Sequence, residues 1–200
     1  LAFALAMGLH VVHRWITRRR DPYPRREIVA SVAITGIAGI SGLAWLLIAA
    51  AVTGSLTAYT DTELAWRSAY VGRGELVPFT PWFEGAVWWA ERAGAPAWAG
   101  VTVLLLAIAA VAAVIASPWM RRLGPDIRFW VASWMLYLLA VFFPQSSTWR
   151  LLLPAFPALG ALAVPRSPVF RCVLIAACLV GQWFWIDGMW AVSAVAWTPP

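Results

Sequence analysis

The 200-residue sequence contains no lysine, only nine acidic residues and only two cysteines, and charged residues make up 12% of it. Soluble globular proteins carry about 25% charged and about 45–50% apolar residues, whereas 62% of this chain is hydrophobic. A chain of this length has too little interior to bury such an apolar excess. The scarcity of charge therefore excludes a soluble globular domain and a disordered chain, and it indicates an integral membrane protein.

The two cysteines, Cys172 and Cys178, lie in one apolar segment. Six residues of helix separate them by about 240° around the axis, so they cannot form a disulfide with each other. Their small number also excludes a disulfide-stapled secreted domain. The two histidines, His10 and His13, have no carboxylate or thiol beside them on the same apolar segment, which favours an interfacial role over a metal site.

Six apolar segments predict membrane-spanning helices, since a span needs about 20 mostly apolar residues. They are Leu1–Trp15, Ile28–Thr53, Ala95–Trp119, Ile127–Phe143, Leu151–Val164 and Val169–Val192. No basic stretch precedes the first one, so we expect residues 1–200 to be the C-terminal transmembrane region of a longer protein. The expected fold class is all-α, a polytopic transmembrane helical bundle of about six spans with the first truncated. Within Ile28–Thr53, the spacing of Gly36, Gly39 and Gly42 predicts close approach of a neighbouring helix.

Arginines are distributed unequally between the two predicted sides. Residues 14–27, 119–128 and 165–171 carry eleven arginines against three acids, a net charge of +8, and the rest of the chain carries four arginines against six acids, a net charge of −2. Cytoplasmic loops carry the basic excess in membrane proteins. The asymmetry predicts a multi-pass plasma-membrane protein with residues 54–94 and the C-terminus outside, and it explains the net positive charge without a nucleic-acid partner.

The outer loop 54–94 is expected to fold into short interfacial helices. Thr60-Asp61-Thr62-Glu63 matches a capping box with Thr60 as N-cap and predicts a helix over Thr62–Tyr70. Thr80 before Pro81 predicts the start of a second helix. Many tryptophans fall on or near this face, which fits either an aromatic belt or a platform for lipid or sugar. They are Trp66, Trp82, Trp88, Trp89, Trp98, Trp149, Trp185, Trp190 and Trp197.

A polar turn from Gln145 to Arg150 separates two apolar segments at the predicted outer face. The helix after it contains Pro154 and Pro157, which remove backbone donors and free carbonyls. Non-helical backbone at membrane depth occurs where it is buried in protein or lines a wet cavity, so we expect this segment to line a cavity open to the outside. Arg150 suits a phosphate because a guanidinium donates two parallel hydrogen bonds. The alternative for Arg150 is an interfacial arginine at a helix end.

Gln145-Ser146-Ser147 with Arg150, followed by Leu-Leu-Pro-Ala-Phe-Pro at Leu152–Pro157, resembles the C-terminal region of the PIG-V-like mannosyltransferases, which are polytopic glycosyltransferases of the GT-C class. The string Tyr59–Arg67 is similar to bacterial members, especially actinobacterial ones. The resemblance implies an enzyme that transfers a sugar, mannose by preference, from a polyprenyl-phosphate donor to a lipid or glycan acceptor on the extracytoplasmic face. The family's catalytic carboxylate usually lies in a first outer loop near the N-terminus. We expect that region to precede this sequence, so no residue here is assigned the catalytic role.

The resemblance also implies roles for residues of the polar turn. Arg150 would stabilise the donor phosphate, and Gln145, Ser146 and Ser147 would contribute to the phosphate and sugar site. Four further residues are candidates for contact with the acceptor or a divalent metal, the one cofactor considered: Asp61, Glu63, Arg67 and Asp187. Structural alternatives stay open, since the capping box explains Glu63, the helix dipole explains Asp61, and we expect Asp187 to pair with Arg150.

Two other functions remain open on the sequence. A transporter or lipid flippase also uses short, proline-broken helices at a polar site, although no internal repeat is found here. A non-catalytic membrane subunit would need neither Gln145 nor Arg150. Surrounding membrane lipids are expected contacts in every case.

Overall fold

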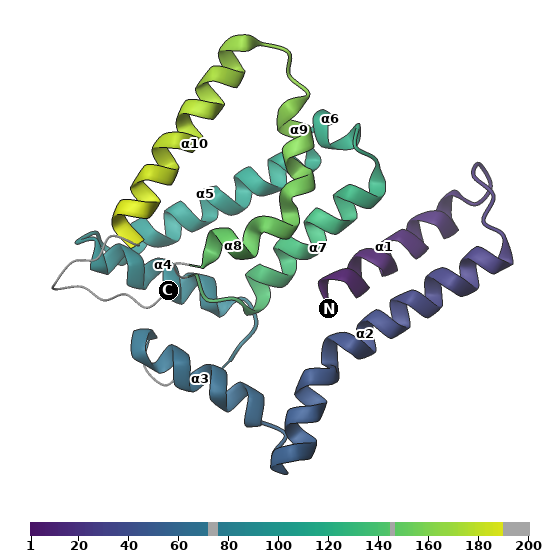
Figure 1. Cartoon of the computed structure of the whole chain (residues 1–200), viewed down its shortest axis with the longest axis horizontal. Helices are drawn as coiled ribbons and strands as arrows, with labels where there is room; N and C mark the ends of the chain where they lie inside the picture. Colours follow the sequence, from purple (N-terminus) through teal and green to yellow (C-terminus); the bar gives the residue numbers. More distant parts are fainter. Residues whose placement is uncertain (72–75, 145–146, 190–200) are drawn as a thin grey trace.

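The computed structural model of the chain describes residues 1–71, 76–144 and 147–189, and every regular element within these ranges is a helix (Figure 1). This confirms the all-α class. The elements are α1 (Ala2–Thr17), α2 (Arg25–Thr53), α3 (Ala58–Val71), α4 (Thr80–Arg92), α5 (Ala97–Ala116), α6 (Pro118–Arg121), α7 (Pro125–Val141), α8 (Thr148–Leu152), the 3-10 helix η1 (Leu153–Ala158), α9 (Leu159–Ala163) and α10 (Pro168–Met189).

Three of these helices, α2, α5 and α10, are long and apolar enough to cross a membrane. The most apolar parts of α2 and α10 bury none of their residues inside the protein, as expected where lipid is the solvent. The other predicted spans are also helical, but α1 has 16 residues, α7 has 17, and Leu151–Val164 is broken into short pieces. The six-span bundle therefore stays a prediction.

Helix α1 packs between α2 and α7. Glycine permits the close approach to α2, because a Cβ atom added at Gly42 would lie 2.7 Å from the backbone nitrogen of Leu1, and one at Gly39 would lie 4.0 Å from Cβ of Ala4. A Cβ atom at Gly36 would meet nothing within 4 Å. The prediction of close helix approach is thus confirmed at Gly42, whereas a Cβ atom at Gly39 would make only an ordinary van der Waals contact and the prediction is wrong for Gly36.

The α1–α2 connection is organised by Arg14. Its guanidinium forms ion pairs with Asp21 and, at 3.0 Å, with Glu27, and it donates to the carbonyl of Pro22 at 3.1 Å. It also lies 5.0 Å from the centre of the Tyr23 ring. The charge of Arg14 is thus engaged within the protein, which leaves the remaining arginines of residues 14–27 to provide the basic excess of this loop.

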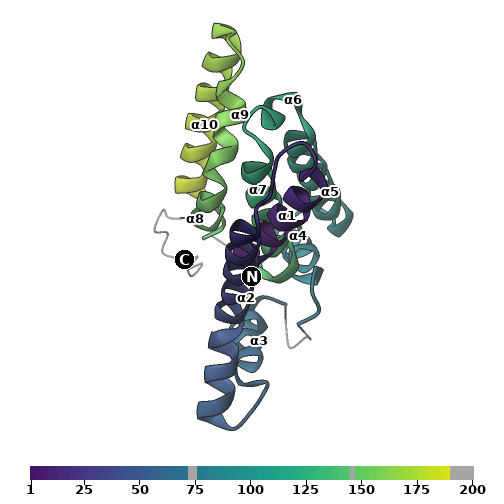
Figure 2. The same cartoon turned by 90° about the vertical axis from the view of Figure 1, so that its right-hand side faces the viewer.

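The arginine-rich connections lie toward one end of the molecule. Figure 1 shows the α1–α2, α6–α7 and α9–α10 connections in its upper half and α3, α4 and α8 lower down, and Figure 2 shows the same division from the side. This arrangement agrees with the predicted grouping of loops by charge. Which end faces the cytoplasm stays a prediction.

The buried core lies where α6, α7 and α9 meet. Met120, Val131 and Ala161 are at most 2% exposed and form one cluster. Ser117 caps α6 by accepting a hydrogen bond from the Met120 backbone at 3.1 Å, and this turns the Met120 side chain into the core. The cluster fixes α9, and with it the proline-broken segment, against α7.

Both helices predicted within residues 54–94 exist, but both predicted caps are wrong. Helix α3 begins at Ala58, and the Thr60 hydroxyl donates to the Thr57 carbonyl at 2.8 Å, so Thr60 lies inside the first turn. Helix α4 includes Thr80, whose hydroxyl donates to the Val77 carbonyl at 2.8 Å. Its N-cap is Phe79, with φ of 74°. In both cases the hydroxyl bonds backward, a pattern that competes with capping.

Candidate functional site

The proline-broken segment is held to α7 by two tryptophans. In a 3-10 helix the N–H of residue i+3 donates to the carbonyl of residue i, and proline has no N–H. Pro157 therefore deprives the Pro154 carbonyl of that donor, and Pro154 offers no N–H to the carbonyl of Leu151, which lies where α8 passes into η1. The Trp134 indole donates to the Leu151 carbonyl at 2.8 Å, and the Trp130 indole donates to the Pro154 carbonyl at 2.7 Å.

These bonds satisfy the broken backbone without the cavity open to the outside that was predicted for this segment, and that cavity stays a prediction. The backbone carbonyls that the prolines free are satisfied by side chains of α7, the other condition under which broken backbone is tolerated at membrane depth. The Trp130 and Trp134 rings stack with centroids 5.7 Å apart. Sequence reasoning recognised the freed carbonyls but missed their partners.

Tryptophans of α4 make a second pair of such bonds. The Trp82 indole donates to the Leu138 carbonyl at 2.8 Å, and the Trp89 indole donates to the Pro144 carbonyl at 2.9 Å. The Phe79 backbone N–H donates to the Ala140 carbonyl at 2.9 Å. These tryptophans therefore anchor α4 to the end of α7 and to Pro144. That is a more specific role than the aromatic belt or the sugar platform predicted from their number.

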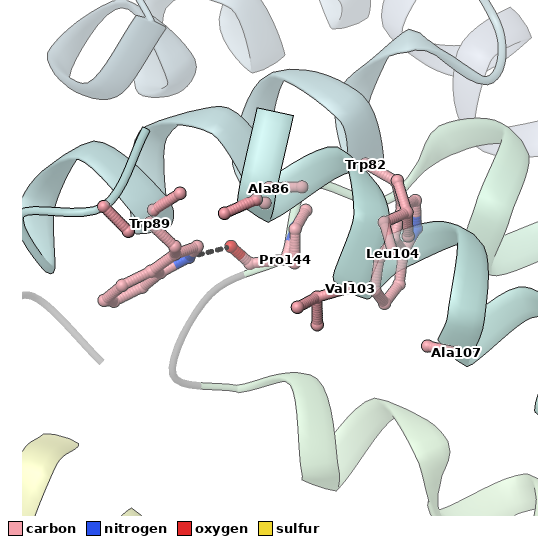
Figure 3. A pocket seen from close by; sticks show the side chains of 11 residues that line it. Trp82, Ala86, Trp89, Val103, Leu104, Ala107 and Pro144 are labelled. Carbon is pink, nitrogen blue, oxygen red and sulfur yellow. Dashed lines mark hydrogen bonds between the residues drawn. The ribbon is translucent and has the colours of Figure 1, made fainter. Parts of the chain in front are cut away.

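A cavity of about 390 Å³ lies between α4 and α5, with Pro144 at one side (Figure 3). It is lined by Trp82, Ala86, Trp89, Ala90, Ala95, Ala99, Gly100, Val103, Leu104, Ala107 and Pro144. The only polar side-chain atoms in this lining are the two indole nitrogens, and both already donate to carbonyls. The cavity is therefore suited to a hydrocarbon group.

The cavity is elongated along α5. Its lining runs from Ala95, just before α5, to Ala107 near the middle of that candidate span, about 18 Å at the rise of an α-helix. Gly100 allows the walls to come together, since a Cβ atom there would lie 2.1 Å from the Ala86 carbonyl oxygen. A chain lying in this cavity would run parallel to the membrane normal if α5 spans the membrane.

Arg150 lies on α8 with its side chain next to Ser147. The Arg150 guanidinium donates through Nη2 to Oγ of Ser147 at 3.0 Å, and Ser147 is 6% exposed while Arg150 is exposed. The structure thus brings together two of the four residues predicted for the donor site. The other two, Gln145 and Ser146, lie outside the described residues.

The predicted ion pair between Asp187 and Arg150 is wrong. Within the described ranges the salt bridges are those of His10 and Arg14, and Asp187 is an exposed residue of α10. The contact between α10 and α8 is aromatic instead, an edge-to-face pair of Trp149 and Trp185 with ring centroids 5.8 Å apart. Two tryptophans next to the charged residues thus provide the contact that was assigned to the charges.

The other acceptor candidates lie on α3, which contacts α2 and α4. Asp61 is exposed and Glu63 is half-buried, and no hydrogen bond described for this part of the chain joins either to Arg150. Arg67 is on the same helix, but its side chain lies outside the described part. In the described residues no three His, Cys, Asp or Glu side chains gather as metal ligands, so no step is assigned to a divalent metal.

An unpredicted polar contact joins α1 to α7. Nδ1 of His10 lies 2.7 Å from Oδ1 of Asp126, and a second cavity of about 300 Å³ lies beside the pair. Phe3 and Trp130, and His13 and Phe129, make edge-to-face contacts between the same helices. The carboxylate partner was missed because it lies on another helix, and nothing in the sequence pairs the two positions.

In its described residues the chain is all-helical, with apolar helices long enough to cross a membrane, a cationic side chain beside a buried serine, and an apolar cavity bordered by Pro144. No family model matches this chain, no curated protein matches it in sequence, and no solved structure matches it in fold.

Proposed function

We propose that this protein is a membrane glycosyltransferase of the GT-C class, similar to the PIG-V-like mannosyltransferases, and that this chain supplies its site for a polyprenyl-phosphate sugar donor. The single observation that supports this most is the placement of Arg150. Arg150 is exposed and its guanidinium is oriented by Ser147, and the helix that carries it, α8, lies away from the arginine-rich connections (Figure 1). The proposal places this site at the extracytoplasmic face.

Transfer would break the bond between the anomeric carbon and a phosphate oxygen of the donor. The acceptor hydroxyl oxygen would form the new bond from the opposite side of that carbon, so the configuration inverts, and its proton would go to a base not assigned in this chain. The phosphate leaves with additional negative charge. Arg150 would stabilise that charge with charge-assisted hydrogen bonds, which are strongest in geometries with two parallel donors.

The cavity between α4 and α5 supports a lipid-linked donor. Its lining is apolar, and Pro144, which borders it, lies six residues before Arg150 in the chain. A polyprenyl phosphate has the matching chemistry, with a hydrocarbon chain attached to an anionic head group. The hydrocarbon part would occupy the cavity while the phosphate reaches the guanidinium.

The contacts of the broken helix favour an enzyme over a transporter. Transporters use unwound backbone carbonyls at broken helices to hold their substrates or ions. Here the carbonyls of Leu151 and Pro154 already accept hydrogen bonds from Trp134 and Trp130. The broken segment would therefore serve to place α8 rather than to offer its own backbone carbonyls to a substrate.

The experiment is transfer of labelled mannose from polyprenyl-phosphate mannose, measured in membranes containing the intact protein. Arg150→Ala should lower the rate about 100-fold or more, as when one transition-state donor is removed, and Arg150→Lys should restore part of it. Arg166→Ala is the control, because Arg166 is an exposed arginine of the α9–α10 connection. Normal transfer by Arg150→Ala would remove the donor role, and lipid translocation without sugar transfer would favour the flippase.

A further inference from the structure

We propose that Trp134 and Trp130 are positioning residues for Arg150. Their indole N–H groups bind the two backbone carbonyls that Pro154 and Pro157 leave without a 3-10 donor, and this fixes the orientation of α8. The inference rests on the proposed donor role of Arg150. Neither tryptophan would touch the donor itself.

The spacing of donors and acceptors matches. Leu151 lies near the end of α8 and Pro154 lies in η1, three residues further on. At a rise of about 1.5–2.0 Å per residue, their carbonyls lie about 4.5–6 Å apart along the axis. Trp130 and Trp134 are four residues apart, which in an α-helix places them on one face, also about 6 Å apart. The partners run in opposite directions, Trp134 with Leu151 and Trp130 with Pro154. The two indole donors on α7 are therefore spaced to reach the two carbonyl acceptors, of Leu151 and Pro154.

The donors are held on a well-packed helix. Val131, Ser133 and Leu138 of α7 are at most 4% exposed, and the two indole rings stack at an angle of 29°. A tryptophan in such surroundings loses little further freedom when it binds a carbonyl. Helix α7 is thus rigid enough to orient the neighbouring segment η1, whose two prolines prevent a regular α-helix.

Helix α8 needs that support. It comprises only Thr148–Leu152, and helices this short are unstable without tertiary contacts. The carbonyl that Trp134 binds belongs to Leu151, the residue directly after Arg150. Its hydrogen bond therefore limits rotation of the backbone next to the guanidinium, while Ser147 orients the guanidinium itself.

The test replaces Trp134 by Phe in the intact protein, which keeps an aromatic ring and removes the N–H donor. Trp98→Phe is the matched control, because Trp98 is 70% exposed and its side chain makes no hydrogen bond described for this structure. We expect Trp134→Phe to lower kcat/KM for polyprenyl-phosphate mannose about 10-fold, with the KM for the acceptor unchanged, because a small misplacement of a catalytic group lowers the rate steeply. Trp130→Phe should act in the same direction but less, since its carbonyl is three residues further from Arg150.

A double-mutant comparison separates positioning from general stability. If Trp134 acts through Arg150, Trp134→Phe will not lower the residual transfer of Arg150→Ala any further. The proposal would be overturned if Trp134→Phe caused the same fold-loss in the Arg150→Ala protein as in the parent protein. A Trp134→Phe variant that behaves like Trp98→Phe would overturn it as well.

A labelling experiment gives a readout without enzyme activity. In protein carrying Cys172→Ser and Cys178→Ser, the Arg150→Cys thiol is reacted with a membrane-impermeant maleimide, with and without Trp134→Phe. We expect Trp134→Phe to change the labelling rate at least threefold, and an unchanged rate would overturn the positioning role. A changed rate together with full transfer by Arg150→Ala would overturn the donor role alone, so the two failures are distinguishable.

Discussion

His10 and Asp126 are 116 residues apart in the chain, and Nδ1 of the histidine lies 2.7 Å from Oδ1 of the aspartate. A carboxylate can only accept, so the histidine donates. The bond joins α1 to the first turn of α7, close to the edge-to-face contact of Phe3 with Trp130. Trp130 also donates to the Pro154 carbonyl. Helix α7 therefore contacts both α1 and the proline-broken segment, and Trp130 takes part in both contacts.

Asp126→Ala should lower the free energy of unfolding by about 0.5–1 kcal/mol. A hydrogen bond to a charged group contributes more than this when buried, but the Asp126 side chain is 66% exposed, and solvent screens the interaction. Thermal unfolding in detergent measures the effect. Glu91→Ala, at an exposed position of α4, is the control. Equal effects of the two substitutions would show that the pair contributes nothing specific.

Gly100→Ala should separate α4 from α5, because the added Cβ atom would lie 2.1 Å from a backbone oxygen, that of Ala86, which cannot move alone. Overpacking of this kind costs about 1–3 kcal/mol. Gly36→Ala is the matched control, since nothing lies within 4 Å of its Cβ position and alanine is the better helix former by about 1 kcal/mol. Thermal unfolding should show a lower Tm for the first and an equal or higher Tm for the second. A Gly100→Ala protein as stable as Gly36→Ala would contradict the described packing.

Arg14→Ala should loosen the α1–α2 connection, because it leaves Asp21 and Glu27 without their shared cation. We expect a loss of about 1–2 kcal/mol of stability, at the low end for charged hydrogen bonds since both carboxylates are largely exposed. Arg14→Lys should recover only part of it, because an ammonium cannot reproduce the planar fork. Limited proteolysis within residues 17–25, with Arg19→Ala as the control, measures the effect. Equal cleavage of the Arg14→Ala and Arg19→Ala proteins would argue against the role of Arg14.

The predicted sidedness can be measured by labelling single cysteines in protein lacking Cys172 and Cys178. Leu56→Cys, at a position that is 90% exposed between α2 and α3, should react with an impermeant thiol reagent on intact cells. Arg19→Cys, in the basic α1–α2 connection, should react only after permeabilisation. The reverse pattern would invert the topology and place Arg150 on the cytoplasmic side.

The sequence patterns predicted most helix positions correctly, but they did not predict the hydrogen bonds between helices. Apolar run length and proline position are local properties, so α2, α5, α10 and the break at Pro154 were all expected close to where they lie. Hydrogen bonds from Trp134 to Leu151 and from His10 to Asp126 depend on how distant helices come together. The spacing of residues along the chain does not predict which residues of two different helices will form a hydrogen bond.

The candidate site shows the same division. Ser147 and Arg150 are three residues apart at the start of α8, and this local spacing brings their side chains together. The expected pair of Arg150 with Asp187 required opposite charges from two helices to meet, whereas Trp149 and Trp185 meet there instead. Aromatic contact area competes well with ion pairs that water can screen.

Binding of polyprenyl phosphate without its sugar tests the central claim most directly, because it isolates the contact between the lipid phosphate and Arg150. The measurement compares the intact protein with its Arg150→Ala and Arg166→Ala variants in the same detergent. The account predicts at least about a tenfold higher Kd for Arg150→Ala, the loss expected for a hydrogen bond between charged groups, and an unchanged Kd for Arg166→Ala. Equal affinities for all three proteins would contradict it.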